Sequence, residues 1–245
     1  MRRAALALVA LALTGCETTA EKSSELERAA KQQQAKGAAQ EALAKHGLSI
    51  TRQSTRVRVL ATTVLHSSEG DAVVLTLRNT SSSSLRNVPI EITVSDAGGA
   101  SIYTNNTGGL SSALVSAPLL RAHSTAVWVD DQISATGTPA SVRAKIGEGT
   151  PATGAIPALS VEGAHLSEAS AGGGAMEGSL VNRSNVAQQE LVVDAIARKG
   201  GKIVAAGRAV LSQAAGGATT HFQLYLIGNP AGAQLELSAS PTTLG

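Results

Sequence analysis

A five-residue motif occurs twice in this chain, each time at the end of an apolar segment. The motif Leu-x-Asn-x-Ser spans residues 77–81 and recurs at residues 180–184, about 100 positions later. Two further matches follow in the same order, namely the glycine pairs at 98–99 and 200–201 and the Gly-x-Pro-Ala segments at 137–140 and 228–231. Matches that keep their order over this distance predict a duplicated domain, so the fold must contain two copies of one small unit.

The apolar residues near these motifs alternate with polar ones. The clearest examples are residues 90–95 and residues 73–78, where Val73, Leu75 and Leu77 share one face and Val74, Thr76 and Arg78 share the other. A period of two is typical of strands with one buried face. It places Ile92 and Val94 in a core, while Thr93 and Ser95 face outward.

Aromatic residues are scarce, and only Tyr103, Trp128, Phe222 and Tyr225 occur. Each core must therefore consist of Val, Leu, Ile and Ala around a single larger side chain, such as Trp128 or Phe222. In the second copy, the turn glycines place Leu191, Val193, Ala195 and Ala197 on one face. We expect Phe222 to fill the space that the two alanines leave.

The first residues have the layout of a bacterial signal peptide. Arg2 and Arg3 precede an apolar run at positions 4–13, which is too short for a membrane span of about 20 residues. The run ends in Leu-Thr-Gly-Cys at positions 13–16, which resembles the bacterial lipobox. This resemblance implies a diacylglyceryl group on the thiol of Cys16, the only cysteine of the chain, and cleavage just before it. The alternative is an uncleaved anchor or secretory signal in which Cys16 is an ordinary small residue.

Two or three acyl chains on Cys16 would hold the protein stably on a membrane, because each buried methylene adds about 0.8 kcal/mol of affinity. We therefore expect a lipid anchor on the outer face of the cell membrane, or on the outer membrane if the cell has two, outside the cytoplasm. Residues 17–47 are rich in Ala, Gln, Lys and Glu, which indicates a solvated, partly helical tether. A coiled-coil oligomerisation helix is the alternative, and Gly37 disfavours it.

Together these patterns predict an all-β fold, with two tandem antiparallel β-sandwiches after a partly helical N-terminal tether. The predicted parts are a signal peptide at residues 1–15, a lipidated tether at 16–47, a first β-sandwich at 48–146, a linker at 147–158 and a second β-sandwich at 159–245. The linker is rich in Gly, Pro and Thr, as flexible connections are.

A strand that closes in Leu-x-Asn-x-Ser, followed by a polar loop, an alternating strand and a glycine turn, resembles the FxLYD-type domain. That domain is an immunoglobulin-like sandwich of bacterial lipoproteins and surface proteins. The family's Phe-x-Leu-Tyr-Asp motif corresponds here to Ile-Thr-Val-Ser-Asp at residues 92–96, where the apolar positions and Asp96 match but the aromatics do not. The second copy, at residues 195–199, departs further. The resemblance implies a binding or spacing module and transfers no catalytic residue to this chain.

Few residues carry recognisable chemistry. Asp130 and Asp131 form the densest acidic spot, which suggests either a site for calcium or a cationic partner, or simply a charged strand end. No motif of a catalytic nucleophile occurs, and we expect no enzymatic activity, no cofactor and no metal site. The histidines lack the spacing of a metal pair, and they are His46, His66, His123, His165 and His221.

The sequence predicts a non-enzymatic envelope lipoprotein that acts as a protein-interaction or spacer module. Its expected partners are the membrane, through the lipid on Cys16, and another envelope protein, which an open sheet edge can accept as an added strand. Nucleic acid is not expected, because without Arg2 and Arg3 the chain has equal numbers of basic and acidic residues. The alternative is a solute- or metal-binding receptor that feeds a transporter, with its ligand between the two domains.

Overall fold

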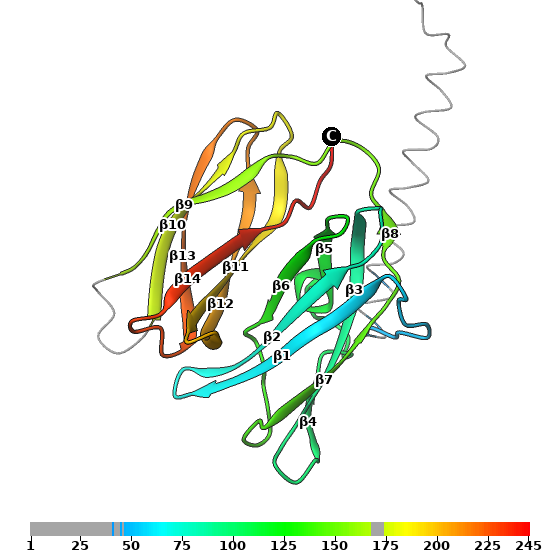
Figure 1. Ribbon diagram of the computed structural model, residues 1–245, viewed down its shortest axis with the longest axis vertical. Coiled ribbons are helices and arrows are strands. Elements are labelled where there is room, and N and C mark those ends of the chain that lie inside the picture. The colour runs from blue at the N-terminus through cyan, green and yellow to red at the C-terminus, as the bar shows by residue number, and fades with distance from the viewer. Residues whose placement is uncertain (1–40, 42–44, 46, 168–173) are drawn as a thin grey trace, which may run out of the picture. The chain divides into compact units, whose positions relative to one another are not determined.

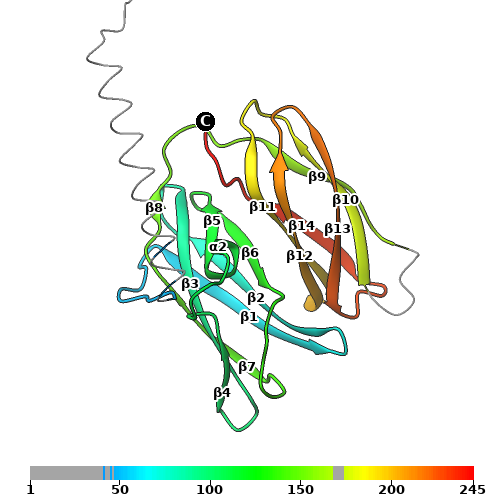
Figure 2. The same ribbon diagram turned by 180° about the vertical axis from the view of Figure 1, so that it is seen from behind.

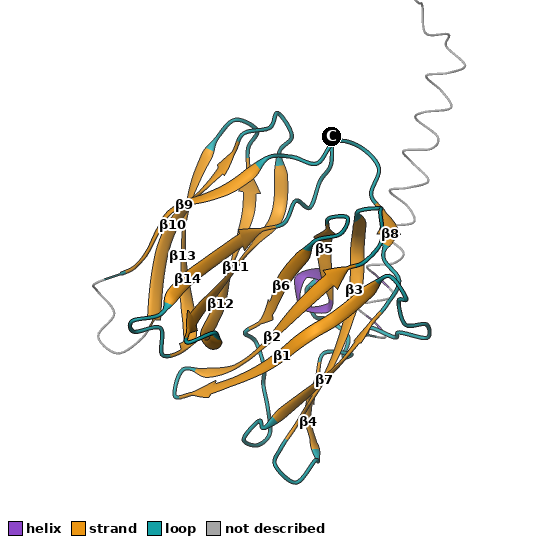
Figure 3. Ribbon diagram, viewed as in Figure 1, coloured by secondary structure: helices purple, strands orange, loops and turns teal. Residues whose placement is uncertain are grey.

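The computed structural model describes Glu41, Lys45 and residues 47–167 and 174–245. The predicted signal peptide, Cys16 and most of the predicted tether lie outside the described residues. Contacts divide the chain into two units, Met1–Ala42 and Leu43–Gly245. The second unit consists of antiparallel strands with the short helix α2 (Ser112–Val115), as Figure 3 shows. The prediction of an all-β fold is therefore confirmed.

Two sheets form the first half of this unit, from β1 to β8 (Figure 1). The first sheet has the order β1-β2-β6, with β1 at Val57–Ser67, β2 at Gly70–Asn79 and β6 at Thr125–Asp130. The second is built on β3, which pairs with β5 and β8 near its start and with β4 and β7 near its end. Its strands are β3 (Leu85–Ser95), β4 (Ser101–Thr104), β5 (Ser116–Leu120), β7 (Ser141–Ile146) and β8 (Thr150–Pro151). The helix α2 contacts β3 and β5 (Figure 2).

The second half is one six-stranded antiparallel sheet of order β14-β11-β12-β13-β10-β9. Pairing between β12 and β13 is brief, at Ala205–Gly228 and Ala206–Ile227, and the edge strands β9 and β14 are in contact. The sheet therefore curls around its own core. Its strands are β9 (Leu159–Leu166), β10 (Gly174–Asn182), β11 (Gln188–Lys199), β12 (Lys202–Ala214), β13 (Thr219–Gly228) and β14 (Gln234–Ala239).

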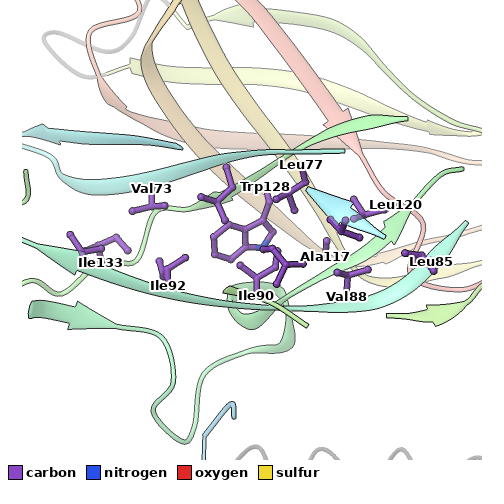
Figure 4. Close-up of a cluster of buried hydrophobic side chains, with 14 residues drawn as sticks. Val73, Leu77, Leu85, Val88, Ile90, Ile92, Ala117, Leu120, Trp128 and Ile133 are labelled. Atoms are coloured by element: carbon purple, nitrogen blue, oxygen red, sulfur yellow. The ribbon is translucent and has the colours of Figure 1, made fainter. Parts of the chain in front are cut away.

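The first core lies between the β1-β2-β6 sheet and the sheet built on β3. Trp128 is its largest side chain, and Figure 4 shows the indole ring among Val73, Leu77 and Ile90. The indole Nε1 donates a hydrogen bond to the carbonyl of Ala113 at 3.1 Å, which satisfies the polar atom of the ring. Along β3, buried and partly exposed side chains alternate from Val88 to Ser95. The predicted register of this strand is confirmed.

Truncating Ile92 to alanine is expected to lower the free energy of unfolding by about 2 to 5 kcal/mol, because buried methyl groups are lost and a cavity remains. Ile92 is fully buried, whereas its neighbour Thr93 lies on the other face of β3. Thr93→Ala is the matched control, with an expected loss of less than about 1 kcal/mol. Urea denaturation of both variants measures the difference, and equal losses would contradict the register.

The asparagines of the repeated motif have matching surroundings in the two halves. Asn79 and Asn182 are both fully buried. The Oδ1 of Asn79 accepts hydrogen bonds from the backbone N–H and hydroxyl of Ser81, at 3.0 and 2.7 Å, and that of Asn182 accepts the same pair from Ser184, at 3.1 and 2.7 Å. Each Nδ2 donates to backbone carbonyls of nearby turns and strand ends. These side chains therefore close the strand ends by hydrogen bonding, which satisfies their buried polar atoms.

The second core lies inside the curled sheet. Leu191, Val193, Ala195 and Ala197 are all fully buried on one face of β11, as predicted. Phe222 belongs to the same cluster. Its ring covers Gly178 on the neighbouring strand, since a Cβ at that glycine would lie 2.7 Å from the ring's Cζ. The prediction that Phe222 fills this core is confirmed.

Residues 147–158, the predicted linker, are hydrogen-bonded to both halves. The backbone N–H groups of Gly147 and Ala152 donate to carbonyls of the first half, each at 2.8 Å, and Thr150–Pro151 form β8. Ala155 and Gly245 exchange two backbone hydrogen bonds, at 3.1 and 3.0 Å. The division into two domains at this segment stays a prediction. The segment itself is held by hydrogen bonds to the strands and loops beside it.

Candidate functional site

An apolar cluster joins the two halves of the unit, and we call it the seam. It consists of Leu65, Ala72, Val74 and Val129 from the first half and Ile196, Ala206 and Ile227 from the second. Val74 and Val129 are cross-strand partners on the outer face of β2 and β6, and Ile196 and Ala206 are partners on β11 and β12.

The seam corrects one expectation. The alternation in residues 73–78 puts Val74 on an outward face, but Val74 is only 1% exposed. The reason is that β12 and β13 pack against this face of β2, so the strand is buried on both sides along residues 72–75.

An ion pair closes the seam at one side. The Nε of Arg208 donates to Oδ1 of Asp131 at 2.9 Å, and the backbone N–H of Arg208 donates to Oδ2 at the same distance. The guanidinium side chain is 2% exposed and the aspartate 16%. Asp131 is therefore paired with a cationic side chain of the same protein. Within residues 47–167 and 174–245, no group of three or more His, Cys, Asp or Glu side chains is arranged to hold a metal ion.

Asp130, the other residue of the acidic spot, is the last residue of β6 and is fully buried. Its Oδ2 accepts a hydrogen bond from the hydroxyl of Tyr103 at 3.2 Å, and its Oδ1 accepts one from the backbone N–H of Gln132 at 3.0 Å. Burial raises the pKa of Asp130 to about 6, against the opposing effects of the Gln132 hydrogen bond and of Arg208. Burial, together with the charge of Asp130, also raises the pKa of Tyr103.

Asp194 is the third carboxylate of this cluster and the cross-strand partner of Arg208. Burial raises its pKa to about 7, although Arg208 and the backbone N–H of Val129 favour the ionised form. Its Oδ1 is buried without a hydrogen-bond partner, and so is Nη1 of Arg208. Both atoms are enclosed by the protein, so each is a buried polar group that lowers stability as long as it has no partner.

Replacing Asp194 with asparagine is expected to flatten the pH dependence of stability. Between about pH 4 and pH 7 the unfolded chain ionises this carboxyl while the folded chain keeps it protonated, given a folded pKa of about 7 and an ordinary value of 3.8. The folded state then binds more protons, so the free energy of unfolding falls as the pH rises through this window.

Urea denaturation of wild type and Asp194→Asn at several pH values measures this effect, and the difference between the two proteins isolates Asp194. A difference that stays constant from pH 4 to pH 7 would contradict the raised pKa.

A cavity of about 430 Å³ lies beside the seam, and Asp194 lines it. Apolar wall residues come from both halves, among them Leu119, Ile196 and Leu237. The wall also holds Arg198 and Glu236, whose side chains pair at 2.9 Å, and Arg121. The cavity thus combines an apolar wall with a few charged groups, which is the composition of small-molecule sites.

The structure leaves the histidines dispersed. His66 contacts Asp71 at 2.6 Å, and the Nδ1 of His165 lies 2.9 Å from the carbonyl of Gly163. His123 is exposed with φ of 52°, and His46 lies outside the described residues. None of these contacts joins two histidines.

The fold brings together a serine and a histidine that are far apart in the sequence. Ser179 and His221 are cross-strand partners whose Oγ and Nδ1 lie 2.9 Å apart. In the described part of the chain no third group hydrogen-bonds His221 to orient it, and His221 is exposed while Ser179 is partly buried, so the pair lacks the oriented base that activates a nucleophile.

Asp194 and Arg208 are functional candidates that the sequence analysis does not identify. Arg208 bonds to a residue that is 77 positions away, so no local motif reports it. The available signal is Asp194 itself, a lone acidic residue inside the otherwise apolar residues 191–197.

Within the described residues, no helix has the length and hydropathy to cross a bilayer. No protein-family model matches the chain, and no curated protein matches its sequence.

Proposed function

We propose that this chain is a non-enzymatic envelope lipoprotein, held on a membrane by lipid on Cys16, whose two β-sandwiches form a protein-interaction or spacer module. The finer fold that we propose is a tandem pair of immunoglobulin-like, FxLYD-type sandwiches. The matched hydrogen bonds of Asn79 and Asn182 support this assignment, because the same side chain closes a strand end in each half.

The seam is the observation that supports a spacer function. Apolar side chains fill the contact between the halves, and the buried pair of Asp131 and Arg208 adds a directional link. A contact of this kind favours one fixed arrangement of the two halves. A fixed pair of domains is what a spacer or a docking platform requires, whereas a receptor that closes by a hinge requires a contact that opens.

Replacing Cys16 with serine is expected to abolish lipid labelling and release the protein from membranes, because the thiol is the only acylation site that the sequence offers. Incorporation of a clickable fatty acid and fractionation of washed membranes measure the two effects. Thr18→Ser is a matched control that should keep both label and membrane attachment. Retention of Cys16→Ser in washed membranes would refute the proposed anchor.

A second candidate function has one observation in its favour. The cavity beside the seam lies between strands of both halves, where a solute-binding receptor would hold its ligand. We propose a receptor lipoprotein that feeds a transporter as this second candidate, with a preformed cavity in place of a closing hinge.

A further inference from the structure

Three acidic residues and one arginine meet where the two halves are in contact. Asp130 ends β6 in the first half and Asp131 follows it, whereas Asp194 and Arg208 are cross-strand partners on β11 and β12 in the second half. The side chain of Arg208 is 2% exposed and that of Asp131 16%, and Asp130 is fully buried. If all three carboxyls ionise, three negative charges face one positive charge in an enclosed place, which is unfavourable.

The guanidinium of Arg208 bonds directly to one of the three carboxylates. Its Nε donates to Oδ1 of Asp131, and the backbone N–H of Arg208 donates to Oδ2. Asp130 instead accepts hydrogen bonds from Tyr103 and from a backbone N–H of the first half. Asp194 makes no ion pair in the described part of the chain, and its Oδ1 is buried without a hydrogen-bond partner. Asp194 is therefore the carboxyl whose charge the cluster compensates least.

The burial of Asp194 depends on the contact between the halves. Its side chain lies on the same face of β11 as Ile196, a residue of the seam, because residues two apart share one face of a strand. The backbone N–H of Val129, on β6 of the first half, donates a hydrogen bond to the carboxyl. Burial raises the pKa of Asp194 to about 7, against the opposing effects of Arg208 and of this hydrogen bond. Separation of the halves would hydrate the carboxyl and lower its pKa toward the ordinary value of 3.8.

The other charged groups near Asp194 do not supply the missing partner. Asp131 raises the pKa of Asp194 further by repulsion. Arg198 and Glu236 line the adjacent cavity and pair with each other at 2.9 Å. Arg121 lines the same cavity but is exposed to solvent, which screens its charge.

Separation of the halves requires no strand to leave its neighbour. Among the described strands, β1 to β8 pair only with one another, and so do β9 to β14. The contacts that would be lost include the seam, the bonds between Arg208 and Asp131, and a hydrogen bond from Arg86 to the carbonyl of Thr242 at 3.1 Å. The halves can therefore separate while each keeps its own sheets and core.

We propose that the seam is a pH-dependent contact, which holds the two halves together at acidic pH and loosens as Asp194 ionises. Docked halves keep this carboxyl protonated over a pH range in which separated halves ionise it, so docking takes up a proton. The equilibrium can then shift toward separation by up to about tenfold for each pH unit. The inference rests on the first proposed function, because it makes the fixed arrangement of the spacer conditional on pH.

Thiol labelling at two adjacent positions of β12 tests the proposal. Ala206 is fully buried in the seam, whereas Ala205 is fully buried in the second core. Ala206→Cys therefore becomes accessible when the halves separate, and Ala205→Cys only when the second half unfolds. Ala72→Cys, fully buried on the first-half side of the seam, is a second reporter of separation.

Reaction of the full chain with iodoacetamide in detergent micelles, followed by mass spectrometry, gives the labelling rates. Wild type reports any reaction of Cys16, the only thiol of the natural chain. Each rate is divided by the rate of the same variant in urea at the same pH, because the thiolate fraction also rises with pH. The resulting ratio measures how often the position is accessible.

We expect the ratio for Ala206→Cys to rise at least about tenfold from pH 5 to pH 7 and to exceed the ratio for Ala205→Cys. Adding Asp194→Asn should remove most of this rise. Glu236→Gln is the matched control, because Glu236 lines the same cavity but is paired with Arg198, and it should leave the rise in place.

Equal ratios for Ala205→Cys and Ala206→Cys at every pH would overturn the proposal, because the halves would then separate only by unfolding. A rise that Asp194→Asn leaves unchanged would overturn it too. A high ratio for Ala206→Cys already at pH 5 would also contradict the fixed arrangement of the proposed spacer. Slow labelling at every pH would instead support that arrangement and reject only its dependence on pH.

Discussion

Replacing Arg208 with leucine is expected to lower the free energy of unfolding by about 3 to 5 kcal/mol, because it leaves a buried carboxylate without its partner. Asp131 accepts two hydrogen bonds from Arg208 and is only 16% exposed. The charge of Arg208 also favours the ionised forms of Asp130 and Asp194. Its loss therefore removes a cation that interacts with three acidic residues.

Urea denaturation measures this loss, and two controls interpret it. Arg143→Leu removes an exposed arginine and should change stability by less than about 0.5 kcal/mol. The double variant Asp131→Asn with Arg208→Leu should recover much of the loss, because no unpaired charge remains and the amide oxygen still accepts from the backbone N–H of residue 208. A double variant as unstable as Arg208→Leu would show that packing of the arginine, and not its charge, holds the seam.

Replacing Phe222 with alanine is expected to lower the free energy of unfolding by about 3 to 5 kcal/mol, because it removes the largest side chain of the second core and leaves a cavity. Phe222 is 7% exposed and packs in one cluster with the alanines of β11. The ring also covers Gly178, which has no side chain to fill the space that the ring would leave.

Tyr225 provides the matched control on the same strand. Its side chain is 67% exposed, so Tyr225→Ala should change the free energy of unfolding by less than about 0.5 kcal/mol. Thermal melts and urea denaturation of the two variants give the comparison. An unchanged melting temperature for Phe222→Ala would show that the core of the second half does not depend on the ring.

Features carried by a single strand could be predicted from the sequence. Burial of Ile92 and exposure of the opposite face follow from a period of two, since side chains of a strand alternate between faces. The same rule places Ala195 and Ala197 inside the second half, and the small size of the alanines then requires a larger residue such as Phe222. These inferences need no knowledge of which strands are neighbours.

The seam could not be predicted in this way. Val74 is apolar on a face that the pattern assigns to solvent, and no local pattern in the sequence indicates that β12 and β13 cover it. The pairing of Asp131 with Arg208 depends on the same contact between halves. Alternation reports the two faces of one strand, whereas the position of one sheet on another depends on long-range packing that no local pattern encodes.

The paired backbone hydrogen bonds of Ala155 and Gly245 bear on how a chain of this kind can grow. They bring the beginning and the end of the second half to one place. A module whose ends meet can be inserted, copied or lost with little displacement of what precedes it, which is why proteins tolerate domain insertion and permutation at such points. If the two halves are the duplicated domains that we propose, this junction is the place where the second copy joins the first.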